Sequence, residues 1–145
     1  MSPRQAAFAT QVPFQLLPGL ELTTRQLKKY DDGRYSIVVA LDNYSDEYIW
    51  FPNSRYGARL LMYSELEERW IELEDGSEAP LEREVVLVPL DKEGSSSDLI
   101  TVNPLLPPGI QPPVTIRIVV VGRIYKDGQP TDQEVGTYLD ITLPP

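Results

Sequence analysis

Residues 31–41 have the sequence DDGRYSIVVAL, which holds the clearest secondary-structure signal in the chain. Asp31-Asp32-Gly33 is typical of a tight turn, because Asp favours turn positions and Gly adopts a positive φ without strain. After the turn, large apolar side chains alternate with smaller or more polar ones, as in a strand with one buried face. The stretch therefore predicts a β-hairpin whose second strand covers residues 34–41. The buried face of that strand is expected to carry Tyr35, Ile37, Val39 and Leu41.

The first strand of this hairpin is expected at residues 21–30, where Leu20, Leu22, Thr24 and Gln26 share one face. Leu27 breaks the alternation and indicates a β-bulge. Turn residues then separate further short strands along the rest of the chain. We expect these strands at residues 48–51, 58–63, 69–73, 84–90, 99–102, 114–125 and 136–143.

More specific predictions can be made for two segments of the chain. Residues 58–63 and 69–73 are predicted to form a second hairpin, with Leu61 and Tyr63 opposite Trp70 or Ile71. The proline-rich residues 104–113 are predicted to form a crossover or corner, since proline cannot donate a backbone hydrogen bond along a sheet.

The frequent Pro and Gly residues along the whole chain favour an all-β fold. Fourteen Pro and nine Gly leave no long window with a helical period. Strands at regular spacing predict a two-layer immunoglobulin-like (Greek-key) β-sandwich of about 7–9 strands, with a jelly roll as the alternative. We expect one domain at residues 19–145, preceded by a tail at 1–18. That tail is either native or the remnant of a longer segment, and it lacks the apolar stretch of a signal peptide.

Composition excludes several classes of function. A net charge of −9 would repel nucleic acid, so no nucleic-acid partner is expected. The chain has no Cys and no His, and therefore lacks the usual thiol nucleophile, general base and transition-metal ligands. We expect no enzyme activity and no cofactor. No apolar run is long enough to cross a bilayer, so no membrane insertion is expected.

Aromatic residues are concentrated between residues 44 and 70. Exposed rings on one sheet face can stack on a sugar or anchor a protein partner. The competing interpretation is a core role, especially for the two tryptophans, because a sandwich usually buries a Trp between its sheets. The candidates for an aromatic binding platform are Tyr44, Tyr48, Trp50, Tyr56 and Trp70.

Acidic residues gather in three loops, and converging carboxylates are what Ca²⁺ requires. Asp42, Asp46 and Glu47 are the candidate ligands, although no EF-hand pattern is present. A second cluster is Asp31-Asp32, and a third comprises Asp91, Glu93 and Asp98. The competing interpretation is that these are solvated loop carboxylates.

Three short motifs resemble a known family. Residues 38–49, VVALDNYSDEYI, resemble the strand, Asn-x-Ser-Asp-Glu, strand step of bacterial immunoglobulin-like domains. Residues 105–109 resemble their Leu-x-Pro-Gly segment, and Gly136-Thr137-Tyr138 resembles the start of their last strand. The family most similar in layout is the BsuPI-type proteinase-inhibitor domain. The resemblance implies a β-sandwich and raises proteinase inhibition as an alternative function.

Taken together, these features predict a non-catalytic immunoglobulin-like module of a bacterial cell-envelope protein. It would recognise a protein or a glycan, or act as a spacer. A proteinase inhibitor and a calcium-stabilised structural domain are the alternatives. A homo-oligomer formed through an edge strand is a further expectation, because residues 48–51 end at Pro52, a residue compatible with a sheet edge.

Overall fold

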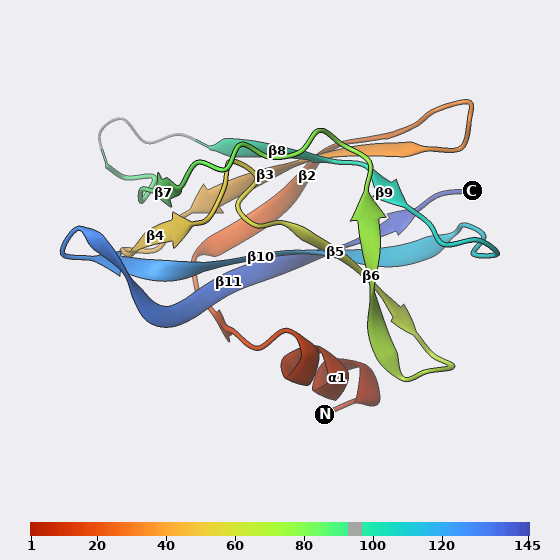
Figure 1. Ribbon diagram of the computed structural model, residues 1–145, viewed down its shortest axis with the longest axis horizontal. Helices are drawn as coiled ribbons and strands as arrows, with labels where there is room; N and C mark the ends of the chain where they lie inside the picture. The colour runs from red at the N-terminus through yellow and green to blue at the C-terminus, as the bar shows by residue number, and fades with distance from the viewer. Residues whose placement is uncertain (93–96) are drawn as a thin grey trace.

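Two β-sheets pack face to face in the computed structural model, which describes residues 1–92 and 97–145 (Figure 1). The arrangement is the predicted β-sandwich. The smaller sheet has the order β2-β3-β8 and is antiparallel throughout. Its strands are β2 (Leu20–Lys29), β3 (Tyr35–Asn43) and β8 (Asp98–Val102).

The larger sheet follows the path β1-β11-β10-β5-β6-β9, with β4 paired to β10 and β7 paired to β4. The long hairpin of β10 and β11 forms the central part of this sheet, and β1 runs parallel to β11. Its strands are β1 (Gln15–Leu16), β4 (Tyr48–Phe51), β5 (Arg59–Ser64), β6 (Arg69–Asp75), β7 (Val85–Leu87), β9 (Pro104–Leu105), β10 (Val114–Lys126) and β11 (Gln129–Leu143).

The hairpins predicted from the sequence are confirmed. β2 and β3 pair on either side of the Asp31-Asp32-Gly33 turn. Their register shifts between Thr24 and Gln26, so the irregularity predicted at Leu27 lies two residues earlier in the strand. β5 and β6 form the second hairpin, in which Tyr63 lies opposite Trp70 as predicted, whereas Leu61 lies opposite Glu72 and not opposite Trp70 or Ile71. Both hairpins are local in sequence, so turn chemistry and alternation are sufficient to define them.

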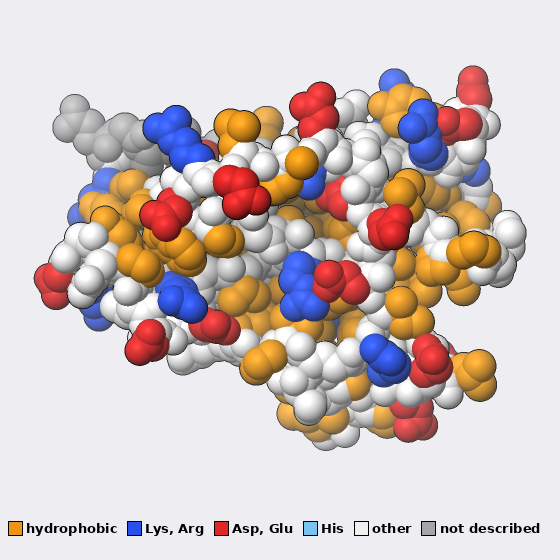
Figure 2. All heavy atoms as spheres, viewed as in Figure 1, with side chains coloured by type: hydrophobic (Ala, Val, Ile, Leu, Met, Phe, Trp, Pro, Cys, Tyr) orange, Lys and Arg blue, Asp and Glu red, His pale blue; other side chains and the backbone are white. Residues whose placement is uncertain are grey.

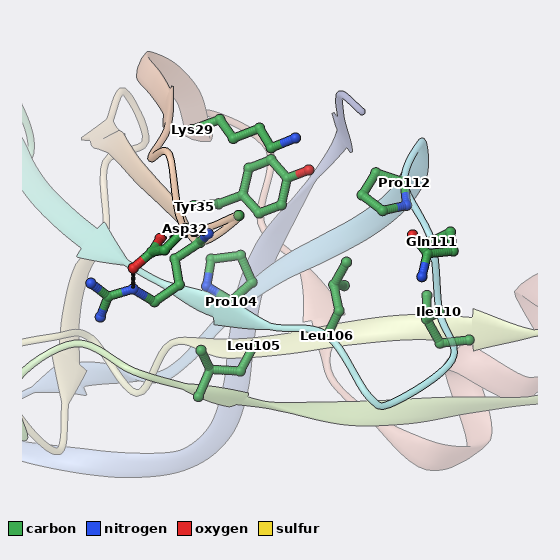
Figure 3. A pocket seen from close by; sticks show the side chains of 11 residues that line it. Lys29, Asp32, Tyr35, Pro104, Leu105, Leu106, Ile110, Gln111 and Pro112 are labelled. Atoms are coloured by element: carbon green, nitrogen blue, oxygen red, sulfur yellow. Dashed lines mark hydrogen bonds and ion pairs between the residues drawn. The ribbon is translucent and has the colours of Figure 1, made fainter.

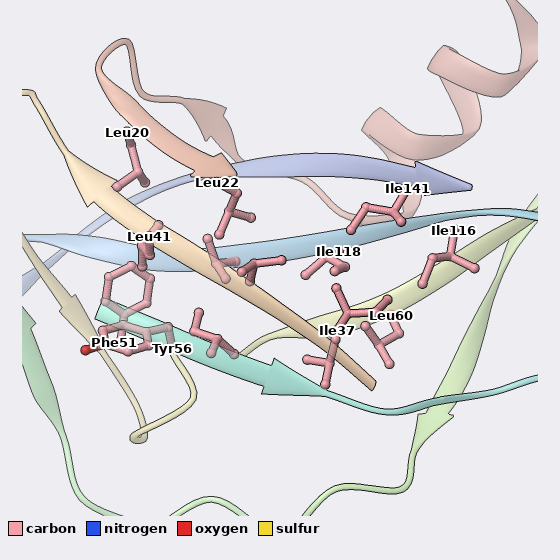
Figure 4. Packing of buried hydrophobic residues seen from close by; sticks show 14 of the residues in the cluster. Leu20, Leu22, Ile37, Leu41, Phe51, Tyr56, Leu60, Ile116, Ile118 and Ile141 are labelled. Carbon is pink, nitrogen blue, oxygen red and sulfur yellow. The ribbon is translucent and has the colours of Figure 1, made fainter. Parts of the chain in front are cut away.

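The main core lies between the two sheets (Figure 4). β3 contributes the four apolar side chains expected from the alternation, all nearly inaccessible to solvent. β10 supplies Ile116, Ile118 and Val120 from the opposite sheet. Within the larger sheet, the backbones of β10 and β4 approach closely at Gly122, where an added Cβ would lie 2.4 Å from the carbonyl oxygen of Trp50. Only glycine fits there, and the space it leaves allows β4 to pair with β10.

The N-terminal residues do not form the expected tail. They form α1 (Pro3–Gln11), followed by β1. Ser2 caps the helix through a reciprocal pair of hydrogen bonds with Gln5, and Pro3 occupies the first turn, where its missing N–H is not needed. Short helices are marginal in water, so this helix depends on its contacts with the sheet.

Those contacts form a second apolar cluster on the outer face of the larger sheet. Phe8 and Val12 of α1 pack against Leu61, Trp70 and Val119. Trp70 is therefore buried under the helix, and not between the two sheets as a sandwich tryptophan was expected to be. Its indole N–H donates to the Arg4 carbonyl oxygen at 3.0 Å.

A buried arginine completes the helix-covered cluster. The Arg117 guanidinium pairs with the Asp140 carboxylate through two hydrogen bonds of 2.7 and 2.9 Å. It also lies over the rings of Phe8, Trp70 and Tyr138, at 4.5, 4.5 and 3.8 Å from their centroids. Arginine tolerates such burial because its planar group can stack on rings while its fork satisfies a carboxylate.

Two other expectations need correction, and they concern β4 and the last strand. β4 is not an edge strand, because β10 pairs with one side of it and β7 with the other, so it cannot mediate oligomerisation through a free edge. The proline-rich segment pairs only at its start, where β9 joins β6. The last strand begins at Gln129, directly after the turn, because the hairpin with β10 continues to its tip. No helix in the described ranges has the length and apolar character of a membrane span.

Candidate functional site

The outer face of the larger sheet is divided between a covered part and an open part. α1 covers the part made by β5, β6 and the middle of β10. The open part comprises β7, β4 and the end of β10, which pair in that order. Figure 2 shows hydrophobic side chains gathered over the end of the molecule where β4 and β7 lie.

The four side chains of strand β4 alternate between the two faces of the sheet. Ile49 and Phe51 point into the main core and are completely buried. Tyr48 and Trp50 therefore point to the outer face, because successive side chains of a strand alternate between its two faces. Tyr48 is exposed and Trp50 is half-buried.

The neighbouring strands extend this surface. On β10, Tyr125 lies directly opposite Tyr48 and Arg123 directly opposite Trp50. On β7, Val86 lies opposite Trp50 from the other side. Directly opposed side chains in a sheet stand about 5 Å apart, close enough to form one surface. We call these five residues, Tyr48, Trp50, Val86, Arg123 and Tyr125, the aromatic face.

The chemistry of the aromatic face is suited to contact with a ligand. The Arg123 guanidinium lies 5.9 Å from the centroid of the Trp50 ring, within cation–π range. The Trp50 indole nitrogen is buried and has no hydrogen-bond partner among the described residues. Tyr48, Val86 and Arg123 are exposed, and Tyr125 is half-buried.

Of the five residues predicted for an aromatic platform, only Tyr48 and Trp50 share this face. Tyr44 is exposed in the loop before β4, at 61% of its full accessibility. Trp70 lies under α1, and Tyr56 is buried against Phe51 with their ring centroids 5.1 Å apart. Tyr56 and Trp70 are therefore core residues and cannot belong to an exposed platform.

Tyr56 has a distinct environment in that core. Its hydroxyl donates a 2.5 Å hydrogen bond to the Asp98 carboxylate at the start of β8. Burial raises the pKa of the Tyr56 phenol well above its usual value, and the hydrogen bond and negative charge of Asp98 raise it further. The pair links the β4–β5 loop to the smaller sheet.

The loop that leads into β4 is held by a buried asparagine. The Asn43 side chain donates to the Glu47 carbonyl oxygen at 2.7 Å and accepts from the Ser45 backbone N–H at 3.0 Å. The Ser45 hydroxyl lies 2.5 Å from the same Asn43 oxygen. Asx turns of this kind fix a loop locally, so Tyr48 enters the sheet in a defined register.

The acidic loops do not assemble a metal centre. Among the residues that the structure describes, no three His, Cys, Asp or Glu side chains lie close enough to hold a metal ion. Asp42 is buried, Asp46 is exposed and Glu47 is half-buried, so the three candidate ligands point into different environments. Glu93 of the third acidic cluster lies outside the described residues.

The surface also has hollows. One, of about 390 Å³, lies between the β2–β3 turn and the proline-rich segment, and its walls include Lys29, Tyr35 and Leu106 (Figure 3). Arg34 also lines this hollow, and its guanidinium nitrogen Nε lies 2.6 Å from the Asp32 carboxylate oxygen Oδ2. A larger hollow of about 650 Å³ lies beside β8.

Comparisons with protein-family models, with curated proteins and with solved structures found no match to this chain. The functional argument therefore depends on the geometry of the molecule.

Proposed function

We propose that this protein is a non-catalytic recognition module that binds a protein partner through the aromatic face. The observation that carries the proposal is the alignment of Tyr48, Trp50 and Tyr125 beside Arg123 on one open surface. Trp, Tyr and Arg are the residue types that contribute most to binding energy in protein interfaces. Val86 adds an apolar contact, which favours a protein surface over a sugar.

The sheet supports this role by keeping the face in place. β4 is paired on both sides and anchored by completely buried Ile49 and Phe51. Side chains that are fixed before binding lose little conformational entropy when the partner arrives. The resemblance to the BsuPI-type family and its inhibitory role stays a prediction, as does residence in a bacterial envelope.

The test compares two double variants in affinity capture from an extract of the source organism. Tyr48→Ala with Trp50→Ala removes two rings of the aromatic face. Tyr30→Ala with Tyr44→Ala removes two exposed tyrosines outside it and serves as the matched control. We expect a protein captured by the wild type and the control to be lost from the face variant. Its affinity should fall by roughly thirtyfold or more, as for an interface hot spot.

A photoreactive amino acid at position 125 should also cross-link to that protein, which establishes direct contact. Equal capture by both double variants would contradict the proposal and leave the domain as a spacer. Binding to a glycan array that depends on Trp50, with no protein captured, would replace the protein partner with a glycan.

A further inference from the structure

The smaller sheet has an open edge at β8. Within the described residues, β8 pairs only with β3, so one side of its backbone takes no part in a sheet. An uncovered strand edge presents unpaired N–H and C=O groups and is a template for another strand. The occupant that satisfies such groups is itself an extended polypeptide.

The residue that follows β8 shows which of its groups face outward. The Asn103 N–H donates to the Asp75 carboxylate at 2.9 Å, and the Asn103 carbonyl oxygen accepts from the Gly76 N–H at 2.8 Å. Both groups point away from β3, toward the end of β6. Backbone direction alternates along a strand, so Leu99 and Thr101 also direct their N–H and C=O away from β3.

A slot lies along this edge. The hollow of about 650 Å³ has Leu99, Ile100 and Thr101 of β8 on one side, and residues 76–81 form its opposite wall. Figure 1 shows the chain after β6, drawn in green, running alongside β8 toward β7. β6 and the β8–β9 segment are thus joined at Gly76 and Asn103 and separate beyond that point.

The wall of the slot is fixed at both ends. At one end, Gly76 is bonded to Asn103. At the other end, the Leu81 N–H donates to the Ser54 hydroxyl at 3.0 Å, and the Ser54 N–H donates to the Leu81 carbonyl oxygen at 3.3 Å. This wall stands across the hollow of about 650 Å³ from β8, so the space suits a single extended chain better than the edge of a second folded sandwich.

The side chains around the slot indicate the chemistry of its occupant. Leu99 and Leu81 are exposed at 63% and 68% and stand on opposite sides, so an apolar side chain would contact both. Glu78 is the exposed carboxylate among the residues that line the slot, where Arg55 is already paired with Asp75 at 3.2 Å. The exposed residues Glu82 and Glu84, with Arg83 between them, follow the wall in the chain. Figure 2 shows acidic side chains on the face that carries this segment.

We propose that the open edge of β8 binds an extended peptide segment of a partner protein by strand addition, and that the segment alternates apolar with basic residues. The peptide backbone would pair with Leu99 and Thr101, its apolar side chains would contact Leu81 and Leu99, and its basic side chains would face Glu78 and the acidic residues that follow it. This site is separate from the aromatic face and does not depend on it.

The test uses an array of synthetic peptides of about seven residues, long enough to span β8, that alternate Val, Ile or Leu with Lys or Arg. We expect members of the array to bind the full chain and to slow hydrogen exchange at the amides of Leu99 and Thr101. The best binder is then resynthesised twice, with N-methyl groups on its odd or on its even amides. One pattern should abolish binding and the other should leave it intact, because only alternate amides of a strand face its neighbour.

The protein is tested with Thr101→Pro, which removes an outward N–H without breaking the pairing with β3. Thr101→Val is the matched control. We expect the proline variant to bind the peptide at least about tenfold more weakly, and the valine variant to bind as the wild type does. Thermal unfolding of both variants verifies that the fold is retained. Tyr48→Ala with Trp50→Ala should bind the peptide normally, which separates this proposal from the proposed function.

Two results would overturn the inference. The first is a failure of every peptide in the array to bind the wild type, or binding that survives both N-methylation patterns. The second is concentration-dependent dimerisation that Thr101→Pro abolishes while no peptide binds, since that would assign the edge to a second copy of this chain.

Discussion

Tyr56 shows how one buried side chain can make the stability of the protein depend on pH. The phenol is neutral in the fold, where burial and the Asp98 carboxylate raise its pKa. In the unfolded chain it ionises near pH 10. The stabilisation is therefore fully present below about pH 10, and it is lost as the pH rises above the unfolded pKa toward the folded one.

We predict that the free energy of unfolding of the wild type falls more steeply above pH 10 than that of Tyr56→Phe. One additional proton bound by the folded state corresponds to a slope of about 1.4 kcal/mol per pH unit. Urea unfolding of both proteins between pH 8 and pH 11 measures the difference in slope, which should correspond to roughly one proton. Parallel pH profiles would show that Tyr56 ionises as freely in the fold as in the unfolded chain.

At the scale of single residues, the sequence shows where the aromatic residues lie in the chain but not which of them are neighbours in the fold. Tyr48 and Trp50 are among the predicted candidates because aromatic residues are concentrated between residues 44 and 70. Tyr125 is not, because only the pairing of β4 with β10 brings it opposite Tyr48. Conversely, Tyr56 and Trp70 lie near in sequence to the exposed rings, yet tertiary contacts bury them.

Among the elements, α1 is the one whose stability depends most on tertiary contact. Phe8 is its buried anchor, and it meets the Trp70 ring edge-on at a centroid distance of 5.4 Å. Without that anchor, a helix of nine residues is too short to persist in water.

We predict that Phe8→Ala releases α1 from the sheet and lowers the free energy of unfolding by about 3 kcal/mol. The measurement is the emission of Trp70 in a Trp50→Phe background, which should shift to longer wavelength as water reaches the indole. Leu66→Ala, at a position exposed in the β5–β6 turn, is the control and should leave emission and stability unchanged. An unshifted emission maximum in Phe8→Ala would show that the helix stays docked without its anchor.

The same helix shows where prediction from sequence reaches its limit. Strands and hairpins followed from alternation and turn residues, which are local signals. α1 carries a local signal as well, since Ser2, Pro3 and Gln5 form a capping sequence, but its apolar side is too narrow to identify alone. The decisive partner is Trp70, whose indole N–H donates to the carbonyl oxygen of Arg4. These two residues are 66 positions apart in the chain, and no local sequence pattern extends over that separation.

For the molecule as a whole, the net charge of −9 opposes the folded state, because folding brings like charges together. Salt screens such repulsion over about 10 Å at 0.1 M ionic strength. We predict that raising NaCl from low concentration increases the melting temperature by roughly 3–5 °C, equivalent to about 1 kcal/mol.

CaCl₂ at matched ionic strength should give the same increase as NaCl, since the described carboxylates form no site for the ion. Differential scanning fluorimetry in the two salts makes the comparison. A melting temperature that does not respond to NaCl would contradict the repulsion argument. An additional increase with calcium would restore the calcium-stabilised interpretation.

The parallel pairing of β1 with β11 determines how the domain responds to a pulling force. Gln15 and Leu16 lie beside Val135 and Gly136, and both strands run in the same direction. Tension applied through the chain before β1 and the chain after β11 pulls these strands in opposite senses along their length. Their hydrogen bonds are then loaded together in shear, and do not open one at a time as in a zipper. This small contact would thus act as a mechanical clamp within any longer chain under tension.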